Sequence, residues 1–122
     1  MTTSVVAHMR KQWIDALRSG EYAQCTLQLR SEANCYCVFG VLCDLAAKRG
    51  VGEWVHTEDG YGFRTRPSIS TEPTTLFNLI PFEIKQLVGL TQTDASRIMS
   101  LNDNGWTFEK LAQHLEITFN EA

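Results

Sequence analysis

The sequence lacks the features that mark several large classes of protein. No apolar stretch approaches the roughly 20 residues that span a bilayer, and the longest one, Val38 to Leu42, is interrupted by Gly40. The N-terminus has no basic segment followed by an apolar run, which is the pattern of a secretory signal. We therefore expect a cytoplasmic protein that does not bind membranes.

Neither sign of charge dominates the chain, and it has only three prolines. The 11 basic and 14 acidic side chains give a net charge of −3 over 122 residues, and 43% of the residues are hydrophobic. This balance is typical of globular proteins rather than disordered ones. Because domains cluster at about 100–150 residues, residues 1–122 are predicted to form a single domain.

Three common catalytic and cofactor motifs are missing from the sequence. It contains no G-x-S-x-G, no G-x-x-x-x-G-K-[ST] and no G-x-G-x-x-G. These patterns mark the nucleophile turn of many hydrolases, the phosphate loop of nucleotide-hydrolysing enzymes and the dinucleotide-binding turn. We therefore expect no bound cofactor.

The four cysteines do not follow the spacing of a zinc site. Cys35 and Cys37 are separated by one residue, whereas zinc ligands usually come as C-x₂-C pairs. Cys43 lies six residues beyond Cys37 and would point to a different face of a helix. We expect reduced, buried thiols and no metal site. An alternative is a cysteine-dependent enzyme. In it, Cys37 at the start of an apolar helix has a lowered thiol pKa, and His56 is its base.

Hydrophobic periodicity predicts a mostly helical α+β fold. Apolar residues at helical spacing predict about five helices, whereas the alternation over residues 22–29 favours a short strand. An Asp-Gly pair predicts an antiparallel β-hairpin over residues 53–55 and 62–66. The helices are predicted at residues 6–18, 37–49, 81–89, 92–101 and 108–117, with that at 37–49 in the centre. Thr91 and Thr107 are suitable caps for the last two helices.

The last two predicted helices do not make a convincing DNA-binding unit. The segment from Thr107 to Ile117 has the apolar spacing of the supporting helix in a helix-turn-helix, but no basic recognition helix follows it. The final 22 residues carry four acidic side chains against Lys110 alone. Acidic surface opposes phosphate binding, so we expect no nucleic-acid partner.

The predicted hairpin is the best candidate for a ligand site. Arg64 and Arg66 are two residues apart and would share one face of a strand. Trp54, His56 and Tyr61 are expected to frame that face. Guanidinium groups bind phosphate or carboxylate, and aromatic rings stack on bases. This pattern predicts a nucleotide-like or acidic small ligand. The alternative interpretation is an ordinary solvated hairpin with two surface arginines.

Four stretches together resemble a family of small, uncharacterised proteins carried by bacteriophages and prophages. They are the segments WIDALRSGEYAQ (13–24), CYCVFGVLCDL (35–45), IPFEI (80–84) and LNDNGWTF (101–108). The resemblance implies a small accessory protein that acts inside an infected bacterium. It implies no established activity that could be assigned to particular residues.

These observations predict a non-enzymatic phage-type accessory protein with a counter-defence role. Such a protein would sequester a nucleotide-derived signal or bind and inhibit a host defence protein. The alternatives are the cysteine-dependent enzyme described above and a structural or interaction module of the phage. The chain's 12 aromatic residues could fill one core or leave a patch for self-association, so a homo-oligomer is left open.

Overall fold

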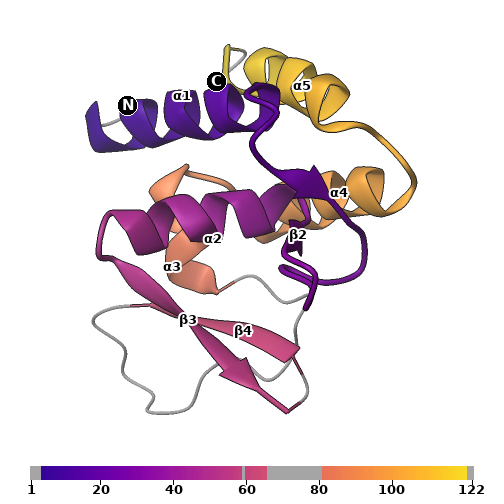
Figure 1. The fold of residues 1–122 in the computed structure, drawn as a ribbon. Coiled ribbons are helices and arrows are strands. Elements are labelled where there is room, and N and C mark those ends of the chain that lie inside the picture. Colours follow the sequence, from indigo (N-terminus) through magenta and orange to yellow (C-terminus); the bar gives the residue numbers. More distant parts are fainter. Residues whose placement is uncertain (1–3, 59, 66–80, 121–122) are drawn as a thin grey trace.

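The computed structural model describes residues 4–58, 60–65 and 81–120. In chain order the elements are α1 (Ser4–Arg18), β1 (Ala23–Gln24), β2 (Cys35–Tyr36), α2 (Val38–Lys48), β3 (Gly52–Thr57), β4 (Gly60–Thr65), α3 (Phe82–Leu87), α4 (Gln92–Asp103) and α5 (Phe108–Asn120). Helices α1 and α5 lie together at one end of the molecule, and the β3–β4 hairpin lies at the other (Figure 1). The predicted α+β fold, with five helices in the described ranges and a short antiparallel hairpin, is confirmed.

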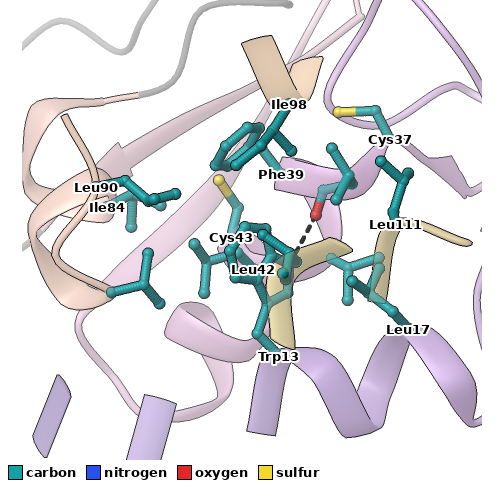
Figure 2. Close-up of a cluster of buried hydrophobic side chains, with 14 of the residues drawn as sticks. Trp13, Leu17, Cys37, Phe39, Leu42, Cys43, Ile84, Leu90, Ile98 and Leu111 are labelled. Carbon is teal, nitrogen blue, oxygen red and sulfur yellow. Dashed lines mark hydrogen bonds between the residues drawn. The ribbon is translucent and has the colours of Figure 1, made fainter. Parts of the chain in front are cut away.

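Helix α2 lies between these two ends and forms the centre of the core. It contacts α1, α3, α4 and the hairpin strand β3, and its residues from Val38 to Cys43 are fully buried. Trp13 of α1 packs against Phe39 of α2, with ring centroids 5.2 Å apart. The Trp13 indole Nε1 donates a hydrogen bond to the Val38 carbonyl at 2.9 Å, so this buried polar atom is satisfied (Figure 2). The central position predicted from the apolar composition of α2 is thus confirmed.

The predicted helix caps are present. The Thr91 hydroxyl accepts from the Asp94 N–H at 3.1 Å and begins α4. The Thr107 hydroxyl accepts from the Lys110 N–H at 3.2 Å and begins α5. Each cap satisfies a backbone N–H that has no partner within its own helix.

The strand predicted over residues 22–29 is mostly wrong. Only Ala23–Gln24 is extended, and it pairs in parallel with Cys35–Tyr36, a partner that the sequence did not suggest. The chain then bends, because Leu27 adopts a left-handed backbone with φ 65° and its N–H donates to Asp103 Oδ1 at 2.9 Å. The Leu29 carbonyl next approaches α2 so closely that a Cβ on Gly40 would lie 1.8 Å from its oxygen.

A buried asparagine joins the end of α4 to this parallel pair. Asn102 is fully buried. Its Oδ1 accepts from the Val38 N–H at 3.1 Å and from Gln24 Nε2 at 2.9 Å, while its Nδ2 donates to the Cys25 carbonyl at 3.0 Å. The Asn102 side chain therefore joins the segments that follow β1 and β2, in place of a further backbone hydrogen bond between them.

Candidate functional site

The register of the hairpin decides which of the predicted site residues lie together. Trp54 pairs with Phe63, and His56 pairs with Tyr61. Because side chains of directly opposed residues point to the same face of a sheet, Trp54, His56 and Tyr61 share one face. These three aromatic side chains therefore lie together.

The predicted arginines are not part of this group. Arg64 pairs with Glu53, one register position away from Trp54, so it projects from the opposite face of the hairpin. There its Nε donates to Glu53 Oε1 at 3.0 Å, in an ion pair that leaves both side chains about one-third exposed. Arg66 lies outside the described residues. The expected combination of Arg64 with the aromatic rings is thus wrong, because an odd spacing separates it from them.

A different arginine occupies the aromatic face. The Arg30 guanidinium carbon lies 4.0 Å from the ring centroid of Tyr61, 5.3 Å from that of Trp54 and 5.5 Å from that of Tyr36. These distances are within the range of cation–π attraction. Arg30, Tyr36, Trp54, His56 and Tyr61 are called the arginine–aromatic cluster below.

The loop between β1 and β2 brings Arg30 to the hairpin. Arg30 forms an isolated antiparallel bridge with Tyr36, which fixes the backbone at this point. Its Nε and Nη2 both donate to Asn34 Oδ1, at 3.1 and 2.8 Å. Within the described residues, Nη1 makes no hydrogen bond, so one edge of the guanidinium keeps its donors available.

The rings of the cluster meet mainly edge to face. The Tyr36 and Trp54 centroids are 6.1 Å apart, and those of Trp54 and Tyr61 are 6.2 Å apart at 80°. The exception is His56, which stacks on Tyr61 at 4.3 Å and 13°. Tyr36, Trp54 and Tyr61 are half-buried, so the cluster is ordered by its neighbours and still reaches solvent.

Asp44 of α2 holds the cluster on the side that faces the core. Its Oδ1 accepts from Trp54 Nε1 at 3.1 Å, and its Oδ2 accepts from the Tyr22 hydroxyl at 2.6 Å. Tyr22 in turn packs edge-on against Tyr36 at 5.0 Å. Two effects raise the pKa of Tyr22 to about 12: burial is the larger, and the hydrogen bond to Asp44 is the second. Tyr22 is therefore protonated at neutral pH and positions the rings rather than transferring protons.

One hydrogen-bonded contact joins the end of the hairpin to the loop. His56 Nε2 lies 2.8 Å from Glu32 Oε2, and both side chains are more than half exposed. Exposed pairs of this kind contribute at most about 1 kcal/mol. The cluster is thus held firmly by Asp44 on its buried side and weakly by Glu32 on its exposed side, which is called its rim below.

The cysteine-dependent alternative finds no support in the geometry. Cys37 is fully buried at the N-cap of α2, where its Sγ accepts from the Gly40 N–H at 3.4 Å (Figure 2). Burial raises the pKa of the Cys37 thiol to about 12, because desolvation outweighs the helix N-terminus. The predicted lowering of this pKa is therefore wrong. The His56 side chain is hydrogen-bonded to Glu32 instead, and in the described structure no hydrogen bond joins His56 to Cys37.

Three other features are absent from the described part of the chain: a metal-binding cluster, a disulfide and a membrane-spanning helix. The described residues include no group of three or more His, Cys, Asp or Glu side chains that could hold a metal ion. All four cysteines are free. Among the described helices, none combines the length and the apolar character needed to cross a membrane.

Sequence reasoning missed Arg30, Tyr36 and Asp44 as parts of the site. Arg30 and Tyr36 come from the loop and strand before α2, and Asp44 comes from α2 itself. The one local signal was the spacing within the hairpin, since Tyr61 and Arg64 are three residues apart and cannot share a strand face. Nothing in the sequence indicates which residue of the 25–34 loop reaches the rings.

Comparison with known proteins identifies a family but no characterised relative. Searches of curated proteins and of solved structures found no match. One family model matches residues 5–119, which is nearly the whole chain, and its description is "Domain of unknown function (DUF8296)". The chain therefore belongs to the DUF8296 family.

Proposed function

We propose that this protein is a non-enzymatic binding protein that holds a nucleotide-derived ligand at the arginine–aromatic cluster. One observation carries the proposal: the Arg30 guanidinium carbon lies within cation–π distance of three half-buried rings, while its Nη1 makes no hydrogen bond within the described residues. A guanidinium held by such contacts can present its remaining N–H groups to a phosphate. The half-buried aromatic rings beside it can contact a nucleobase.

Lys48 adds a second positive charge beside the cluster. Its Nζ lies 3.4 Å from Asp44 Oδ2 and 3.2 Å from the Tyr22 hydroxyl, at the far end of the row of rings from Tyr61. Its side chain is 65% exposed, so its ammonium remains accessible to solvent. Arg30 and Lys48 both act electrostatically on Tyr36, which lies between them. A ligand with two phosphates around a stacked base would match this arrangement.

The phage-type resemblance supports a biological role for such binding. Inside an infected bacterium, in the host cytosol, a non-enzymatic protein with this site would act by removing a nucleotide-derived signal from host defence. The burial of Cys37 favours binding over catalysis, because the thiol expected to act as the nucleophile is inaccessible. The competing interpretation is that the rings merely fasten the hairpin to α2.

Calorimetric titration with cyclic dinucleotides and nucleoside triphosphates tests the proposal. A charge-assisted hydrogen bond contributes about 1.5–3 kcal/mol, so Arg30→Gln should weaken binding by roughly 10- to 150-fold. Arg64→Gln is the matched control, since it makes the same chemical change on the opposite face of the hairpin. Its affinity should stay within about twofold of the original, because Arg64 lies away from the rings.

The melting temperature of each variant separates binding from folding. Arg30 and Arg64 are both half-buried surface residues, so both variants should fold. The proposal fails if no nucleotide binds the original protein. It also fails if Arg30→Gln and Arg64→Gln weaken binding equally. The rings would then serve only to fasten the hairpin to α2.

A further inference from the structure

The Tyr36 hydroxyl is a polar group of the arginine–aromatic cluster that the fold does not use. It makes no hydrogen bond to residues 4–58, 60–65 or 81–120. By contrast, the Tyr22 hydroxyl and the Trp54 indole N–H beside it both donate to Asp44, at 2.6 and 3.1 Å. Tyr36 is half-buried, so solvent reaches it and its hydroxyl can bond a ligand, as Arg30 Nη1 can.

Backbone and ring contacts fix the position of Tyr36. The parallel pair joins it to Gln24 of β1, and Arg30 forms an antiparallel bridge with it. Its ring packs edge-on against the Tyr22 ring at 5.0 Å and against the Trp54 ring at 6.1 Å. A side chain held in this way loses little conformational freedom when a ligand binds, so ordering takes little from the affinity that its hydrogen bond adds.

Two cations act on Tyr36. Arg30 has no carboxylate within ion-pair distance in the described residues, whereas Lys48 shares its charge with Asp44 at 3.4 Å. Burial, and to a smaller extent Asp44, raises the pKa of Tyr36, and the two cations offset part of this effect. The hydroxyl is therefore protonated at neutral pH and can donate to an anion. The Tyr61 hydroxyl also has no described hydrogen bond, but Tyr61 lies at the end of the row of rings away from Lys48.

The acceptors around the cluster already hold it together. Asn34 Oδ1 accepts two hydrogen bonds from Arg30. Both Glu32 oxygens contact His56 Nε2, and both Asp44 oxygens accept from ring residues. A base is identified through the donors and acceptors on its edge, whereas stacking tolerates any base. The groups left to a ligand are thus donors, which suit phosphate oxygens and cannot pair with the N–H groups of a base edge.

We infer that Arg30 Nη1 and the Tyr36 hydroxyl bind one phosphate group between them, so that the site selects its ligand by phosphate and accepts any nucleobase. The inference rests on the proposed function, because it concerns the same cluster. A phosphate oxygen is a strong acceptor for both donors, and the rings of Trp54 and Tyr61 would contact the base without identifying it. The ligand class is therefore nucleotides in general rather than those of one base.

Calorimetric titration with ADP, GDP, CDP, UDP and inorganic pyrophosphate tests the inference. The four nucleotides should bind with dissociation constants within about threefold of one another, since stacking tolerates any base. Tyr36→Phe removes the hydroxyl and keeps the ring, so it should weaken ADP binding about tenfold or more. It should weaken pyrophosphate binding by the same factor, because the base takes no part. Its melting temperature should stay unchanged, since the hydroxyl bonds nothing in the described structure.

The outcomes separate this inference from the proposed function. If none of the four nucleotides binds, the proposed function fails and the inference fails with it. If they bind but Tyr36→Phe binds ADP as tightly as the original protein, only the inference is overturned. A spread of more than tenfold among the bases would overturn it as well, because the base would then be identified. So would a Tyr36→Phe variant that loses affinity for ADP and keeps it for pyrophosphate, since the hydroxyl would then contact the base.

Discussion

Replacement of Asn102 by leucine should destabilise the protein more than a comparable change at its surface. Leucine has a similar volume and no polar atom, so the Val38 N–H, the Cys25 carbonyl and Gln24 Nε2 would each lose a partner. An unpaired buried backbone group costs about 1–3 kcal/mol. Two such groups and one lost side-chain hydrogen bond give an expected loss of about 3–7 kcal/mol in the free energy of unfolding. That is a large share of the roughly 5–15 kcal/mol that stabilises a typical domain.

Urea unfolding followed by tryptophan fluorescence measures this loss directly. Asn104→Ala provides the control, because Asn104 is exposed two residues away and its side-chain amide donates to Ser100, at 2.7 Å to the carbonyl oxygen. Removal of that exposed contact should cost no more than about 1 kcal/mol. If Asn102→Leu and Asn104→Ala reduce stability equally, the buried amide does not bridge the strands in the way that its geometry implies.

Three further predictions concern the backbone and the thiols. Gly40→Ala should lower the free energy of unfolding by about 3 kcal/mol, because its Cβ would meet the Leu29 carbonyl. If the variant is instead more stable, as the higher helix propensity of alanine alone would make it, the segment at Leu29 moves aside without cost. Leu27→Gly should raise the melting temperature, since it relieves about 1 kcal/mol of left-handed strain at a side chain that is 68% exposed. Burial raises the pKa of Cys37 from 9.0 to about 12, so the unfolded chain ionises first and stability should fall as the pH rises through this range. Cys37→Ala should reduce that fall in urea titrations at increasing pH, and an unchanged slope would contradict the assignment.

The helices could be predicted because their signals are local. Four apolar residues at helical spacing identify α1, and the Thr91 and Thr107 hydroxyls mark the beginnings of α4 and α5. The β1–β2 pair could not be predicted. It is two residues long and depends on Asn102, which is more than 60 residues away in the sequence.

The candidate site was predictable only within the hairpin. The alternation of side chains along each strand, applied to the observed register, places Trp54, His56 and Tyr61 on one face and excludes Arg64 from it. Arg30 reaches the rings because the loop before β2 folds back across the hairpin, with Glu32 held by His56 and Leu29 by the close approach at Gly40. Such long-range placement depends on tertiary packing, which composition and spacing do not report.

The weak rim of the arginine–aromatic cluster has a consequence for the kinetics of the site. Its closing contacts, between Glu32 and His56 and between Arg30 and Tyr61, lie at the surface, whereas the core beneath is fully buried. The loop and the hairpin tip can therefore separate by local opening at a free energy well below that of global unfolding. Backbone amides there should exchange with solvent faster than those of α2, and a bound molecule could enter and leave without melting the helices.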